Sequence, residues 1–179
     1  MTGVAEQYGQ ALYELARDEK LSDPILKQLQ ALTESFRTEP DFLRLLASHN
    51  LSKDERCALV DVSFQGSVHP YLLNFLKILT QEGIARKFPD CCKHFERLYY
   101  ADHDILPVLV YSAQPLTPTQ TDLLTEKLAA ITGKTVRLEG RLDPDCLGGV
   151  RICYDGKQVD DTVKNRLEAV GKLLKNTVL

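Results

Sequence analysis

The chain has 179 residues, of which 44% are hydrophobic and 26% charged, and its formal net charge is −3. These values are typical of a globular protein and exclude a disordered or disulfide-scaffold composition. The net negative charge excludes an overall basic surface of the kind that binds nucleic acid or anionic lipid. The longest apolar run covers residues 105–111. A membrane-spanning helix needs about 20 residues, so we expect no direct membrane insertion.

The first 104 residues carry the periodicity of amphipathic helices, six in all. In the first helix, apolar side chains recur with helical spacing from Val4 to Leu15. In the second, the pattern predicts Asp23 as the capping residue and Pro24 as the first helical residue. The later helices are expected to begin at Pro40, at Ser52 with its capping-box partner Glu55, at Pro70 and near Pro89.

The predicted fifth helix is apolar on most of its surface, because only Asn74 and Lys77 are polar between Tyr71 and Leu79. Such a helix needs neighbours on most sides. Two interpretations remain open. The helix is central in a bundle, or one of its sides covers the core while the other receives a partner helix.

The pattern changes to mixed α and β after residue 104. Residues 105–111 are typical of a strand buried on both faces. A helix is predicted between its cap Thr117 and Gly133, and the alternation that follows predicts three strands. The last two strands meet at a hairpin turn, Asp155-Gly156, and a final helix is expected to begin after Asp161 or Thr162.

The predicted fold class is therefore mostly α with a smaller α+β part. We expect an N-terminal six-helix bundle in residues 1–104. A small α+β domain in residues 105–179 follows it, in the order strand, helix, three strands, helix.

Little in the sequence favours catalysis or a bound cofactor. The adjacent Cys91 and Cys92 lack the second ligand pair that a structural zinc site needs. The sequence has no nucleophile elbow and no phosphate-binding loop. We therefore predict no catalytic residue, no cofactor and no metal ion, and we expect a protein that is not an enzyme. The basic residues near the C-terminus lie together with acidic ones, so no nucleic-acid partner is expected.

Several motifs, in order along the whole chain, resemble the delta subunit of bacterial F-type ATP synthase, a relative of the mitochondrial oligomycin-sensitivity-conferring protein. The first part contributes YGQALYELA at residues 8–16 and Gln81-Glu82-Gly83 with Arg86, and the second part contributes Ser112-Ala113 with Pro115-Leu116. The C-terminal motif consists of Asp143, Gly148, Gly149, Val150, Asp160, Arg166 and Leu167. The chain departs from the family pattern at Gly9, where Ala is more usual, and at Cys146, Cys153 and Asp161.

The resemblance implies a non-catalytic stator subunit of the peripheral stalk. Such a subunit links the catalytic alpha/beta head to the membrane-anchored b stalk, so that rotor torque drives ATP synthesis. It implies that residues 1–104 bind the N-terminal helix of an alpha subunit and that residues 105–179 contact the end of the b subunit. It also implies a peripheral location at the cytoplasmic face of the bacterial cell membrane.

The family's helix-binding groove lies between its first and fifth helices. Carried over to this chain, the groove consists of Tyr8, Ala11, Leu12, Leu15, Leu72, Phe75, Leu76 and Leu79. The alternative hypothesis for the function is a free-standing helical adaptor or nucleic-acid-binding module.

Overall fold

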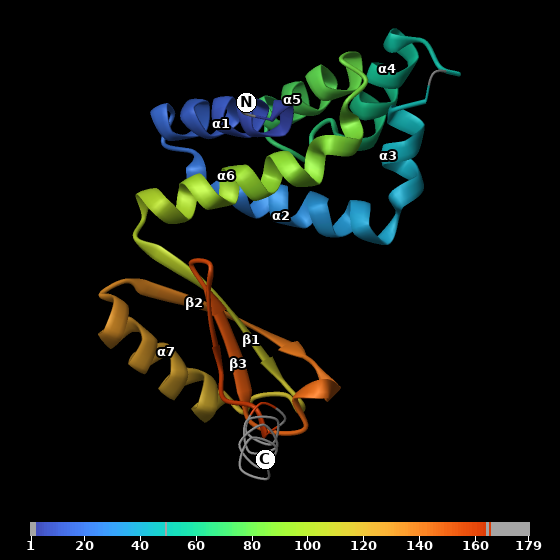
Figure 1. Ribbon diagram of the computed structural model, residues 1–179. Coiled ribbons are helices and arrows are strands. Elements are labelled where there is room, and N and C mark those ends of the chain that lie inside the picture. The colour runs from blue at the N-terminus through green and yellow to red at the C-terminus, as the bar shows by residue number, and fades with distance from the viewer. Residues whose placement is uncertain (1–2, 49, 164, 166–179) are drawn as a thin grey trace. The chain divides into compact units, whose positions relative to one another are not determined.

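The computed structural model describes residues 3–48, 50–163 and 165 of the chain. The protein is mostly helical and has a small four-stranded sheet (Figure 1). Its internal contacts divide it into two compact units, Met1–Tyr99 and Tyr100–Leu179. Within the described residues, no helix combines the length and the apolar character that crossing a membrane requires.

The first unit is built from helices. They are α1 (Val4–Asp18), α2 (Ser22–Thr38), α3 (Pro40–Leu46), α4 (Lys53–Phe64), α5 (Pro70–Gln81) and α6 (Phe88–Asp102), with a short 3-10 helix, Ala85–Lys87, before α6. The predicted starts of α3 and α5 at proline are confirmed. The capping box of α4 is confirmed too. The amide of Glu55 donates to the Ser52 hydroxyl at 3.3 Å, and the amide of Ser52 donates to the Glu55 carboxylate at 2.8 Å.

The predicted start of α2 is wrong by two residues. The helix begins at Ser22, and the backbone of Leu21 occupies the capping position. Asp23 lies inside the first turn, where its carboxylate accepts a hydrogen bond from the hydroxyl of Tyr99 near the end of α6. The Asp23 side chain therefore holds two helices together and does not cap its own helix.

A cluster of aromatic rings around the buried Phe36 links several helices of the first unit. The rings of Phe42, Phe64 and Phe88 lie 5.8, 5.9 and 5.1 Å from that of Phe36, the first stacked and the other two edge-on. These geometries are the ones that aromatic pairs prefer, and they add to the gain from burying the rings. Phe36 on α2 thus joins α3, α4 and α6.

The second unit consists of a sheet with a helix packed against it. The elements after α6 are β1 (Ile105–Ser112), α7 (Pro118–Thr132), β2 (Thr135–Leu142), a 3-10 helix (Pro144–Cys146), β3 (Val150–Tyr154) and β4 (Lys157–Asp160). The sheet order is β2-β1-β3-β4. The pair β1 and β2, which α7 connects, is parallel, whereas the other two pairs are antiparallel.

The prediction that the strand over residues 105–111 is buried on both faces is wrong. Leu106, Val108 and Val110 are buried and form a core with Leu128 of α7. Pro107, on the opposite face of β1, is exposed. Among the described elements α7 covers one face of the sheet, so only alternate residues of the apolar run are buried. Beyond Asn165, the predicted last helix lies outside the described residues.

Candidate functional site

Helix α1 has two different faces. Its inner face buries Gly9, Leu12, Tyr13 and Ala16 in the core of the first unit. On the other side lies the outer stripe, which we define as Val4, Tyr8, Ala11 and Leu15. Ala11 is exposed, Tyr8 is half-buried, and Val4 and Leu15 are 51% and 41% exposed. These positions follow the i, i+4, i+7, i+11 spacing, so they form one continuous apolar stripe along the helix.

Helix α5 is mainly a core helix. Leu72, Phe75, Leu76 and Leu79 are all at most 6% exposed. One flank is tied to α4, because the ammonium of Lys77 lies 2.6 Å from the carboxylate of Asp61. Among its large apolar side chains, Ile78 is the most exposed, at 45%.

The eight residues carried over from the family's groove therefore divide into two groups. Leu12, Leu72, Phe75, Leu76 and Leu79 are buried in the chain's own core, whereas Tyr8, Ala11 and Leu15 belong to the outer stripe. Sequence reasoning left Val4 and Ile78 out of that set. The helical spacing from Tyr8 could have added Val4 to it. Nothing in the sequence shows which side of the nearly all-apolar α5 faces outward, so Ile78 could not have been singled out.

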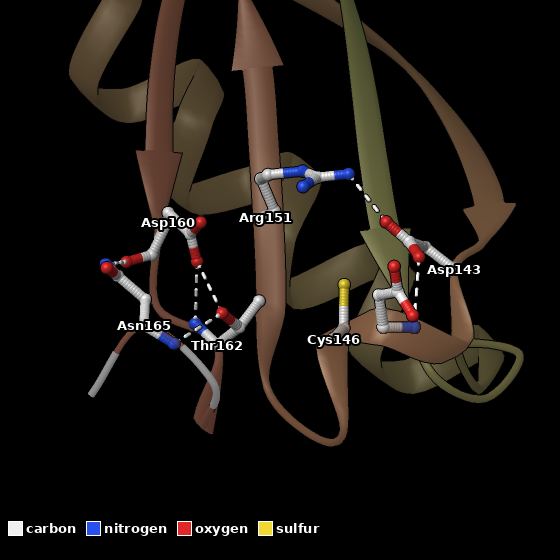
Figure 2. Close-up of a pocket in the computed structure, with 7 residues that line it drawn as sticks. Asp143, Cys146, Arg151, Asp160, Thr162 and Asn165 are labelled. Atoms are coloured by element: carbon white, nitrogen blue, oxygen red, sulfur yellow. Dashed lines mark hydrogen bonds and ion pairs between the residues drawn. The ribbon is translucent and has the colours of Figure 1, made fainter. Parts of the chain in front are cut away.

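Two residues of the C-terminal motif, Asp143 and Asp160, line a polar cavity of about 350 Å³ at one end of the sheet (Figure 2). Asp143, directly after β2, accepts a hydrogen bond of 2.6 Å from the guanidinium of Arg151 on β3. The other oxygen of the same carboxylate accepts the amide of Asp145 at 3.1 Å. Both oxygens of Asp143 are thus occupied by groups of this chain.

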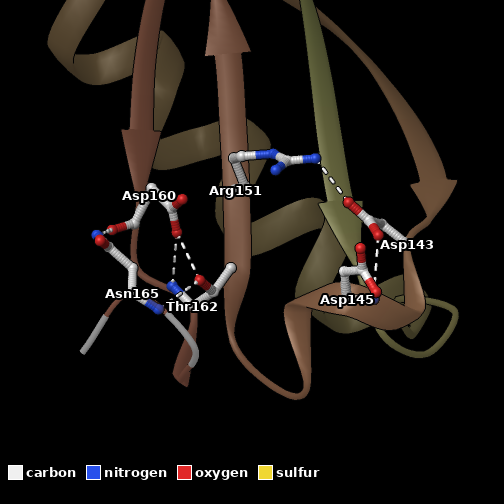
Figure 3. Close-up of polar contacts among 6 residues, drawn as sticks. All are labelled: Asp143, Asp145, Arg151, Asp160, Thr162 and Asn165. Carbon is white, nitrogen blue, oxygen red and sulfur yellow. Dashed lines mark hydrogen bonds and ion pairs between the residues drawn. The ribbon is translucent and has the colours of Figure 1, made fainter. Parts of the chain in front are cut away.

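The motif residue Asp160 organises the segment that follows β4 (Figure 3). Its carboxylate accepts hydrogen bonds from the amide and the hydroxyl of Thr162, at 3.0 and 2.7 Å. The hydroxyl oxygen of Thr162 accepts the amide of Asn165 at 3.3 Å, in the manner of a helix cap. Asp160 therefore orients the residue that caps the chain's next turn.

The two glycines of the motif allow this segment to approach β3 closely. Gly149 has a φ of +76°, and a Cβ atom there would overlap the carbonyl oxygen of Asp161. The amide of Val163 donates to the carbonyl of Gly148 at 2.9 Å. The structure thus brings Asp143, Gly148, Gly149, Val150 and Asp160 to one end of the sheet, whereas Arg166 and Leu167 lie outside the described residues.

The arrangement is suited to holding segments together. In the part of the chain that the structure describes, His, Cys, Asp and Glu do not gather in groups of three or more that could hold a metal ion. Burial raises the pKa of Cys91 to about 11 and that of Cys92 to about 12. Both thiols are therefore protonated at neutral pH and are poor nucleophiles.

Comparison with known proteins identifies the family. The model of the ATP synthase delta (OSCP) subunit family matches residues 4–174. The chain belongs to this family. It is 33% identical over 172 residues to ATP synthase subunit delta of Moorella thermoacetica, and the match covers 96% of each chain. It is 32% identical over 171 residues to that of Desulfitobacterium hafniense strain DSM 10664 / DCB-2, again over 96% of each chain.

A solved structure shares the fold of this delta-family chain. The protein aligns with a TM-score of 0.74 to a chain in a cryo-EM structure of the Toxoplasma gondii mitochondrial ATP synthase hexamer. The alignment covers 96% of this chain and 97% of that one at 16% sequence identity.

Membership in the delta (OSCP) family makes the chain a structural subunit of ATP synthase and a component of its peripheral stalk. The relatives match it over nearly their whole length. A free-standing helical adaptor or nucleic-acid-binding module is therefore not favoured.

Proposed function

We propose that this delta-family chain ties the catalytic alpha/beta head to the membrane-anchored b stalk and performs no reaction itself. The head would turn with the rotor unless it were held, so the connection must resist torque during ATP synthesis. A contact under torque must dissociate slowly, and apolar anchor residues buried at the contact slow dissociation. The single observation that carries the proposal is the exposed apolar stripe on α1, in a chain whose family assembles into ATP synthase.

We place the head-binding contact on an N-terminal six-helix bundle domain, residues 1–104. In this proposal the N-terminal helix of an alpha subunit lies along α1 and α5. Tyr8, Ala11 and Leu15 contact the partner helix directly, together with the exposed Val4 and Ile78. The remaining groove residues are buried in the core and support this surface from within. They are Leu12, Leu72, Phe75, Leu76 and Leu79. An apolar stripe at this spacing is the surface that an amphipathic helix recognises.

We place the contact with the end of the b subunit on the α+β domain, residues 105–179. One chain that carries both contacts raises the effective concentration of each, so neither contact has to be strong alone. In this arrangement the protein lies at the cytoplasmic face of the bacterial cell membrane as a peripheral part of the synthase.

The test of the head contact replaces Leu15 with Asp. A carboxylate in an apolar contact must lose its hydration without gaining a partner. Binding of a peptide that copies the alpha-subunit N-terminal helix is measured by titration calorimetry, and we expect it to weaken at least about tenfold. The matched control is Val62→Asp, because Val62 on α4 is 86% exposed and is not part of the outer stripe. Unchanged affinity in a folded Leu15→Asp variant would contradict the groove assignment.

The test of the non-catalytic role is ATP hydrolysis by the purified chain alone. We expect no phosphate release above that of a buffer control. Turnover that follows the protein through a second purification step would overturn this part of the proposal.

A further inference from the structure

Gly9 lies on α1 at a close contact with α6. A Cβ atom on Gly9 would lie 2.6 Å from the carbonyl oxygen of Cys91 and 2.9 Å from the Cβ atom of His94. Both distances are shorter than carbon contacts in folded proteins allow. The absence of a side chain therefore permits the observed approach of the two helices.

The obstacle to a larger residue cannot move aside. The Cys91 oxygen belongs to the backbone of α6, and a helix backbone in a close-packed core moves only with its whole element. Cys91 and Phe95 of α6 are buried, and the ring of Tyr13 on α1 packs edge-on against that of Phe95 at 5.2 Å. A side chain at residue 9 would therefore lift α1 away from α6.

Any such displacement carries the outer stripe with it. Tyr8 is the neighbour of Gly9 in the chain, and Ala11 lies half a turn further on α1. The partner helix contacts these side chains if the proposed function holds. Packing between two helices depends on how closely the facing side chains fit. The position of α1 on α6 therefore affects how well the partner helix packs against the outer stripe.

We propose that Gly9 is a positioning residue for the partner helix, because its missing side chain sets how deeply α1 sits on α6 and so where the outer stripe is presented. This inference rests on the proposed function and names the residue that adjusts its binding surface. The close approach also accounts for this chain's departure from the alanine that is more usual in the family, although glycine in the middle of a helix weakens the helix relative to alanine.

The test is Gly9→Ala, with Ala16→Gly as its matched control. Ala16 is fully buried on the same inner face of α1, so its replacement by glycine weakens the helix without pushing it away from α6. Binding of the alpha-helix peptide is measured by calorimetry in about 0.5 M trimethylamine N-oxide, which favours the folded state of every variant. Far-UV circular dichroism and thermal unfolding report on folding in the same buffer.

We expect Gly9→Ala to bind the peptide about tenfold more weakly than the wild type, and Ala16→Gly to stay within about twofold. We also expect Gly9→Ala to lower the melting temperature, although alanine is the better helix former. Equal affinity of Gly9→Ala and the wild type for the peptide overturns the inference and leaves the proposed function standing. An equal loss of affinity in Gly9→Ala and Ala16→Gly has the same consequence. A wild type that does not bind the peptide overturns the proposed function and this inference with it.

Discussion

The guanidinium of Arg151 lies 2.6 Å from the carboxylate of Asp143, and its central carbon lies 4.7 Å from the centre of the Tyr111 ring. Arg151 lies on β3, Asp143 directly follows β2, and Tyr111 lies on β1. The side chains of Arg151 and Asp143 are 31% and 22% exposed, so their charges are partly shielded from water. This contact joins three segments of the second unit at the end of the sheet where the C-terminal motif gathers.

Replacing Arg151 with Met is expected to lower the free energy of unfolding by about 2 kcal/mol, because hydrogen bonds to charged groups contribute about 1.5–3 kcal/mol. Asp143 would keep its charge without its partner. Arg151→Lys keeps the charge but loses the planar group that lies over Tyr111. Its free energy of unfolding should therefore lie between those of the wild type and Arg151→Met. Urea unfolding followed by far-UV circular dichroism measures the loss. An Arg151→Met variant as stable as the wild type would show that the contact of Arg151 with Asp143 does not stabilise the fold.

Gly149→Ala is expected to destabilise the second unit by at least about 2 kcal/mol, since the new methyl group meets the backbone of Asp161 in addition to the strain of a positive φ. Gly133→Ala is the matched control. Gly133 also has a positive φ, +68°, but nothing lies within 4 Å of a Cβ atom there, so we expect only the strain, about 1–2 kcal/mol. Thermal unfolding compares the two variants. Equal losses would show that the close approach at Gly149 has no energetic effect.

The capping box of α4 should make stability depend on pH. Hydrogen bonds from the amide and hydroxyl of Ser52 hold the pKa of Glu55 below its usual value of 4.5. The charged carboxylate therefore stabilises the fold above pH 4.5, and this contribution is lost as the pH falls through the lowered pKa. Glu55→Gln keeps an acceptor but cannot titrate.

The measurement for Glu55 is the melting temperature of the wild type and Glu55→Gln between about pH 3 and 7. We expect the wild type to melt higher at neutral pH and the difference to shrink in acid. A difference that stays constant over the whole range would exclude the charge of Glu55 as its source.

The five thiols should react in two groups. Cys91, Cys92 and Cys146 are buried, and burial raises the pKa of all three, whereas Cys57 and Cys153 are half-buried. Because the thiolate is the reactive form and must be reached by reagent, a disulfide reagent at pH 8 should modify Cys57 and Cys153 first. Mass spectrometry of peptides identifies the labelled residues. Rapid labelling of Cys92 in the folded protein would contradict its burial.

Local sequence signals predicted most helix ends correctly, because these signals act within one turn of backbone. Ser52 with Glu55, Thr117 with Gln120, and proline at the first position of a helix each satisfy or remove unpaired amides in their own turn. The predicted start of α2 was wrong because a contact with a distant residue outweighs the local signal at Asp23. Asp23 looks like a cap locally, but its carboxylate is bonded to Tyr99, which is 76 residues away in sequence.

Burial depends on which elements meet, and local signals do not contain that information. The apolar run of β1 is compatible with one or two covered faces, and the packing of Leu128 on one side leaves Pro107 exposed. For the same reason the sequence could not divide the groove residues between core and surface. Periodicity identified the apolar side chains of α1 and α5 but not the direction in which each faces.

Residue types and their spacing are enough to identify the family, to place most of the helices and strands that the structure describes, and to pick out the C-terminal motif. The packing of the helices is needed to see that Leu12 and Leu76 are core residues, that Val4 and Leu15 are exposed, and that Gly9 lies against the backbone of α6. These facts depend on how helices far apart in sequence pack together. That packing is set by the combined shapes of many side chains and not by any one segment.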